Sequence, residues 1–192
     1  ILMGGAAVAP ALNDIKDYFG ADLDFLTSLI ITLPSLAVAI VGYAVGIAAD
    51  RFGKVKVLLT SLVIFTAAGA VSYVIPDMFD VRETQLLVIL VARFVVGIGI
   101  AGITSTVTAL IAEYYSGIDR VKVLSYQSAA MGIGVLILEF TGGTLAEVSW
   151  RTPFLVYLIG IPILILAIAS LREPHMSRED REEIEEIVSH EK

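Results

Sequence analysis

The sequence predicts an all-α membrane protein, a bundle of six transmembrane helices. Hydrophobic residues make up 57% of the 192 residues and charged residues only 17%, whereas a soluble domain carries about 25% charged residues. The apolar residues are gathered into runs that approach the ~20 residues a helix needs to cross a bilayer. Because backbone polar groups inside a bilayer must be paired within the chain, helices are the expected structure of these runs.

The first run, residues 1–12, is too short to span a bilayer. No basic residues precede it, so it does not resemble a signal peptide. We interpret it as the second half of a truncated first helix, followed by a polar, amphipathic stretch to Asp24. Pro76 and Asp77 are predicted to end the third helix. The other five helices are predicted at 25–49, 57–75, 86–114, 123–148 and 152–171.

The chain divides into this bundle, residues 1–171, and an acidic segment, residues 172–192, interpreted as a cytoplasmic tail or a linker between bundles. Ser177 is placed as the N-cap of a short surface helix in the tail. The tail supplies much of the net charge of −7, so the charge does not indicate a nucleic-acid partner and none is expected. Its acidic residues are Glu173, Glu179, Asp180, Glu182, Glu183, Glu185, Glu186 and Glu191.

No motif in the sequence indicates an enzyme or a metal protein. The chain has no cysteine, which excludes disulfides, thiol nucleophiles and thiolate metal sites. The H-E-x-x-H and G-x-S-x-G motifs are missing, and the histidines, His175 and His190, both lie in the tail. We therefore expect no catalytic activity, no cofactor and no metal.

The Lys and Arg residues of the loops predict the orientation in the membrane, because cytoplasmic loops carry more of them. One side receives Lys16, Arg82 and Arg151. The loops after the second and fourth helices, together with the tail, receive more, so we expect them to be cytoplasmic in a multi-pass protein of the cell membrane. The basic residues of that side are Arg51, Lys54, Lys56, Arg120, Lys122, Arg172, Arg178 and Arg181.

Two ionisable residues, Arg93 and Glu139, lie well inside predicted spans, where each costs about 2.5–3.5 kcal/mol. At about 1.5 Å per residue they lie at similar depth, roughly 10–13 Å from the same membrane surface. We expect them to face a common cavity and to pair, either as a static lock between helices or as a site that handles substrate or protons. A carboxyl group holds its proton weakly beside an arginine and strongly in apolar surroundings. Gln127 is a further cavity candidate, because its amide is hard to satisfy within its own helix.

Small residues recur along the predicted helices and indicate close helix–helix packing. Gly42 and Gly46 lie one turn apart on the second helix. The glycines proposed to pack helices together on the fourth and fifth are Gly97, Gly99, Gly142 and Gly143.

A compact charged turn joins the second and third helices, with the pattern Gly46-x-x-x-Asp50-Arg51-x-Gly53-Lys54. It resembles the cytoplasmic loop motif of the major facilitator superfamily, although Val55 occupies a position that is often basic there. Two more motifs follow in the order of that superfamily. Arg93-x-x-x-Gly97-x-Gly99 resembles its fourth-helix motif, and Trp150-Arg151-x-x-Phe154 is similar to the turn that enters its sixth helix.

The resemblance implies a fold of two six-helix bundles, each built from inverted three-helix repeats, with substrate bound between them. This chain would be the N-terminal bundle, and its partner would be a C-terminal half or another copy. The charged turn would act as a latch. Asp50 would cap charges or a helix N-terminus of the opposite bundle, while Arg51 and Lys54 would pair with acids such as Glu113.

The function implied is secondary active transport by alternating access: proton-coupled export of small organic molecules across the lipid bilayer. The drug–proton antiporters are the nearest type. Gly142 and Gly143 fit the end of their fifth-helix signature, but Leu138 and Glu139 stand where Gly-Pro is expected. The alternatives are a facilitator or symporter of sugars or metabolites, and an isolated half-transporter module without transport activity by itself.

Overall fold

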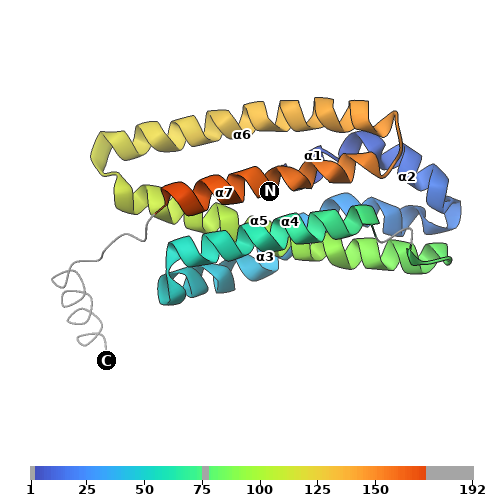
Figure 1. The fold of residues 1–192 in the computed structure, drawn as a ribbon, viewed down its shortest axis with the longest axis horizontal. Helices are drawn as coiled ribbons and strands as arrows, with labels where there is room; N and C mark the ends of the chain where they lie inside the picture. Colours follow the sequence, from blue (N-terminus) through green and yellow to red (C-terminus); the bar gives the residue numbers. More distant parts are fainter. Residues whose placement is uncertain (1–2, 75–77, 172–192) are drawn as a thin grey trace.

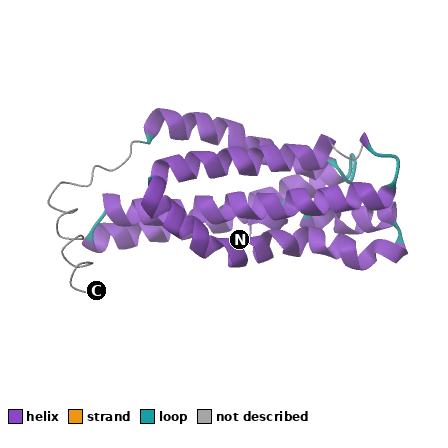
Figure 2. Ribbon diagram, turned by 90° about the horizontal axis from the view of Figure 1, so that it is seen from below, coloured by secondary structure: helices purple, strands orange, loops and turns teal. Residues whose placement is uncertain are grey.

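The computed structural model describes residues 3–74 and 78–171, and its helices run back and forth along one long axis (Figure 1). Seen at 90°, the helices lie nearly parallel, with their connecting loops at the two ends (Figure 2). The all-α membrane architecture expected from the sequence is confirmed. The expected helix end at Pro76 and the tail helix at Ser177 lie outside the described residues. Within the described ranges, five helices are long and apolar enough to cross a membrane: Ala21–Phe52, Lys54–Val74, Arg82–Tyr114, Gly117–Ala146 and Thr152–Ser170.

The N-terminal segment is a broken helix rather than one half-span. α1 (Met3–Ala6) is followed by a turn, by the 3-10 helix η1 (Ala9–Ala11) and by α2 (Leu12–Phe19). Pro10 has no N–H to donate and its ring clashes with a preceding helical turn, which explains why α1 does not continue. The polar stretch is itself helical and amphipathic, with Ile15 fully buried.

α5 (Arg82–Tyr114) is the central helix. It packs along much of its length against both α3 (Asp24–Phe52) and α4 (Lys54–Val74), which touch each other far less. Helices α3 and α5 approach closely at Gly97, where a methyl group would lie 2.5 Å from the Pro34 carbonyl oxygen. Only a glycine fits between the two helices at that point.

The same helix uses glycines against α4. A Cβ atom at Gly99 would lie 2.8 Å from the Cβ of Phe65, and one at Gly102 would overlap the Ser61 hydroxyl. Small residues thus let α5 approach both neighbours, as expected where lipid supplies no hydrophobic drive for association.

A single residue, Gly53, separates α3 from α4. The 3-10 helix η2 (Ala21–Leu23) leads into the other end of α3. Gly53 has φ 102° and ψ 137°, a conformation that residues with a side chain rarely adopt. This requirement explains the glycine in the middle of the charged turn.

The last span changes helix type, which the sequence does not predict. Thr152–Ile159 forms the 3-10 helix η4, and Gly160–Ser170 forms α7. Pro162 contributes to the change, because it cannot donate to the carbonyl four residues earlier. η4 packs on α4, where the missing side chain of Gly69 leaves room for the Tyr157 ring.

α6 (Gly117–Ala146) is the most exposed of the spans. It contacts η4, α1 and η1 and only slightly α5, and it lies along one edge of the molecule in Figure 1. Gly142 packs directly on the Ala7 backbone, while a Cβ at Gly143 would make ordinary contact with Pro10 at 3.8 Å. Gly142 is therefore a close-packing position and Gly143 is not.

Candidate functional site

Arg93 is fully buried at the junction of three helices. Its Nε donates a hydrogen bond to the carbonyl oxygen of Ile30 on α3 at 3.0 Å. Its Nη1 donates to the Tyr157 hydroxyl on η4 at 2.6 Å. The guanidinium carbon also lies 5.4 Å from the ring centroid of Phe154 and 5.2 Å from that of Tyr157. Polar and cation–π contacts together make a buried cation tolerable here.

The acceptor on α3 is explained by the local sequence. In an α-helix, the Ile30 carbonyl would accept a bond from the N–H of residue 34. Residue 34 is a proline inside the helix and has no N–H. Arg93 donates to the carbonyl that Pro34 leaves without a helical partner, and Gly97 lets α5 come close enough to do so.

The acceptor on η4 is explained by the helix type. A 3-10 helix has three residues per turn, so residues three apart lie on the same face. Phe154 and Tyr157 are spaced in this way and both meet the Arg93 side chain. Tyr157 was not predicted as a site residue. Its position three residues after Phe154 of the Trp150–Phe154 motif could have indicated it, because the two share a face of a 3-10 helix.

The rest of that motif holds η4 at its N-terminal end. The Trp150 ring lies 4.7 Å from the Tyr18 ring and 5.5 Å from the Phe19 ring, between centroids. The Arg151 guanidinium lies 5.0 Å from the Trp150 ring. The motif therefore connects η4 to α2 through the Trp150 ring, and its Phe154 ring contacts the Arg93 guanidinium.

The expected pair between Arg93 and Glu139 is not formed. The Glu139 side chain is exposed on α6, and in the described part of the chain it makes no ion pair. The physical reason is that α3, α5 and η4 enclose Arg93, whereas α6 barely touches α5. Gln127 is half-buried on α6, about 120° around the helix from Glu139 at 3.6 residues per turn. Arg93 and Glu139, which were predicted to share a cavity, are therefore not brought together, and Gln127 lies on another side of α6 from Glu139.

The charged turn forms an ion-pair cluster at the opposite end of α3 and α4 from α2. The Lys54 ammonium pairs with Glu113 at the end of α5 and lies 3.8 Å from the Asp50 carboxylate. The expected contact of Lys54 with Glu113 is therefore present. Arg51 instead lies over the Phe52 ring, 5.7 Å from its centroid.

Two members of the turn face outward. The Asp50 side chain is 76% exposed, and a Cβ atom added at Gly46 would have no heavy atom within 4 Å. The packing within this bundle does not require a glycine at Gly46. The exposed acid and the bare backbone are both available to another part of the protein.

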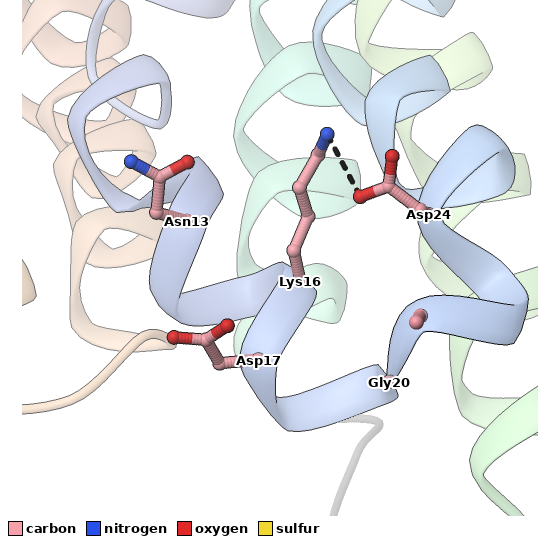
Figure 3. A pocket seen from close by; sticks show the side chains of 6 residues that line it. Asn13, Lys16, Asp17, Gly20 and Asp24 are labelled. Carbon is pink, nitrogen blue, oxygen red and sulfur yellow. Dashed lines mark ion pairs between the residues drawn. The ribbon is translucent and has the colours of Figure 1, made fainter.

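A polar hollow lies at the other end of the bundle, where α2 turns into α3 (Figure 3). It has a volume of about 710 Å³ and is lined by Asn13, Lys16, Asp17, Gly20, Ala21 and Asp24. Lys16 crosses it to pair with Asp24 at 2.8 Å. In residues 3–74 and 78–171, no group of three or more His, Asp or Glu residues could hold a metal ion.

Comparison with known proteins places these motifs in a family. Residues 1–190 match the model of the Major Facilitator Superfamily. The chain is 34% identical to multidrug resistance protein 1 of Bacillus subtilis over 135 residues, covering 69% of this chain and 32% of the relative. It is 29% identical to the quinolone resistance protein NorA of Staphylococcus aureus over 181 residues, covering 92% of this chain and 44% of the relative. The chain spans less than half the length of these relatives.

Proposed function

This chain belongs to the major facilitator superfamily, and on that premise we propose that it is the N-terminal half of a proton-coupled transporter that exports small organic molecules. Its relatives bear the names of multidrug and quinolone resistance proteins, which supports efflux and a quinolone as a first test substrate. The transport path would lie between this bundle and a second one, with α3 and α6 facing it.

The observation that carries the proposal is the exposed carboxylate of Glu139 on an apolar face. Its neighbours on α6 include Leu136, Ile137 and Phe140, all of which are more than half exposed. An isolated charge on such a face is unfavourable within a membrane unless it is protonated, paired or in a watery cavity. We assign Glu139 to the cavity between bundles, where it would take up a proton or pair with a cationic substrate. Gln127, on the same helix but nearer to the charged turn, would contribute an amide to the wall of this cavity.

Arg93 would act on this cavity through its charge rather than by touching substrate. Its guanidinium is held by fixed partners on α3 and η4. A permanent cation inside the bundle favours the ionised form of a carboxylate that approaches it. Movement of α6 relative to α5 would therefore change the distance between the Glu139 carboxylate and this fixed positive charge.

The charged turn would control opening at the cytoplasmic side. Lys54 and Glu113 hold the turn to α5, and the exposed Asp50 and bare Gly46 would meet the second bundle. A contact worth about 1–3 kcal/mol shifts a two-state balance by a factor of about 5 to 150. Such a bond can be made and broken during each cycle.

The test is transport by the complete protein in liposomes with an imposed pH gradient and a fluorescent quinolone. Glu139→Gln is expected to abolish the response to the gradient. Glu147→Gln, an exposed carboxylate beyond the end of α6, is the matched control and should transport normally. Unchanged pH dependence in Glu139→Gln would exclude the proton role of Glu139. Downhill flux of the substrate in the absence of a pH gradient would favour a facilitator.

A further inference from the structure

A second hollow lies between α3 and α4 beside the charged turn. It has a volume of about 320 Å³. Ala48 and Phe52 of α3 form one wall, Lys56, Thr60 and Ile64 of α4 form the other, and Ile98 of α5 forms part of the floor. The hollow exists because α5 packs against both helices while they barely touch each other.

Along its length this groove offers apolar contact and little hydrogen bonding. The Thr60 hydroxyl is already used, because it donates to the Lys56 carbonyl oxygen at 2.9 Å. From Lys56 to Ile64 the wall extends about 12 Å along the helix. A ligand that fills the groove is therefore a narrow apolar chain.

The end of the groove beside the charged turn is positively charged rather than apolar. Lys56 lines it, and the Arg51 guanidinium lies over Phe52, another lining residue. In the ranges that the structure describes, neither cation has a carboxylate partner, since Lys54 takes both nearby acids. Two positive charges thus stand at the end of an apolar groove.

We propose that this groove binds one acyl chain of an anionic phospholipid, with the lipid phosphate held by Lys56 and Arg51. α4 begins at Lys54, so Lys56 lies at the edge of the span, where lipid headgroups are found. Basic residues placed there attract anionic lipids. A helix of a second bundle is about 10 Å wide with its side chains and is too broad for a hollow of this volume. The lipid site would lie on the side of α3 and α4 that faces the bilayer, apart from the proposed transport path.

The test is lipid retention by the complete protein, measured by native mass spectrometry after purification in detergent and addition of phosphatidylglycerol or phosphatidylcholine. The unchanged protein should retain phosphatidylglycerol preferentially. Lys56→Gln should weaken that retention about fivefold, the contribution of one basic residue near a headgroup, while Lys56→Arg should keep it. Lys122→Gln is the matched control, because Lys122 lies at the same end of the bundle but pairs with Asp119.

A second variant tests the groove itself. Ala48→Phe fills the hollow and should abolish phosphatidylglycerol retention, whereas Ala169→Phe, at an exposed position on α7, should not. Equal retention of both lipids that is insensitive to Lys56→Gln would overturn the headgroup assignment. Retention that survives Ala48→Phe, or equally strong binding of glycerophosphoglycerol without acyl chains, would overturn the acyl-chain site.

Discussion

Arg93 on α5 donates a hydrogen bond to the backbone carbonyl of Ile30 on α3, at 3.0 Å. That carbonyl has no helical donor, because Pro34 follows it by one turn. Each group supplies what the other lacks inside an apolar bundle: the cation needs acceptors, and the carbonyl needs a donor. The proline and the arginine are therefore one feature, although they stand on different helices.

A double-mutant cycle tests this relationship. Arg93→Met removes the donor and leaves the Ile30 carbonyl unsatisfied, which should destabilise the protein by about 1–3 kcal/mol. Adding Pro34→Ala restores an N–H at residue 34 and should recover a large part of that loss. The measurement is the midpoint of thermal unfolding in detergent. Pro10→Ala on η1 combined with Arg93→Met is the control and should be additive, and additivity in the Pro34 cycle as well would refute the link.

Removing only the Tyr157 hydroxyl isolates the second partner of Arg93. Tyr157→Phe keeps the ring beside the guanidinium but loses an acceptor for a charged donor, so stability should fall by about 1.5–3 kcal/mol. Tyr43→Phe, at a side chain that is 83% exposed, should leave the unfolding midpoint unchanged. If both variants unfold at the original temperature, the hydrogen bond does not hold η4 in place.

Glycines that look alike in the sequence should respond oppositely to a methyl group. Gly97→Ala places a Cβ 2.6 Å from that of Ala37, and such overpacking should destabilise the protein by about 1–3 kcal/mol. Gly132→Ala, where nothing lies within 4 Å, should be neutral or stabilising by up to about 1 kcal/mol. Thermal unfolding in detergent compares the two, and a loss at Gly132 equal to that at Gly97 would contradict the packing described here.

The latch proposal predicts a kinetic effect without a loss of stability. Asp50→Asn should slow transport by the complete protein, yet leave substrate binding intact, because the exposed Asp50 contributes little to folding through a 3.8 Å contact. Asp119→Asn, which removes another exposed acid at the same end, should transport at the normal rate. Loss of binding with normal cycling would count against a latch.

The spans were predictable because their composition is extreme. Their described ends lie within four residues of the predicted ones, except that α6 begins at Gly117, six residues before the predicted start. The charged turn was predictable too, down to the contact between Lys54 and Glu113. The partners of Arg93 were not, because a cation within a span suggests a carboxylate partner such as Glu139, whereas the acceptors are a backbone carbonyl and a tyrosine hydroxyl. A proline within a predicted helix marks a carbonyl four residues earlier as a free acceptor, and Ile30 was identifiable on that basis.

Two other features depend on information that a local pattern does not contain. The change from 3-10 to α at Gly160 is set by how η4 fits against α4, where Gly69 and Thr66 receive Tyr157 and Gly160. The exposure of Glu139 is set by what covers α6, which helical periodicity in one bundle does not specify. The depth of a residue along a span does not specify the direction in which its side chain points.

The 3-10 segment η4 also has a consequence for length. A 3-10 helix rises about 2.0 Å per residue and an α-helix about 1.5 Å, so Thr152–Ser170 reaches roughly 32 Å, close to the ~30 Å hydrocarbon thickness of a bilayer. Rewinding η4 into an α-helix would shorten the span by about 4 Å. A change of helix type in η4 would therefore alter the length of the last span by itself. It would draw Leu171 toward the membrane interior without any change in tilt.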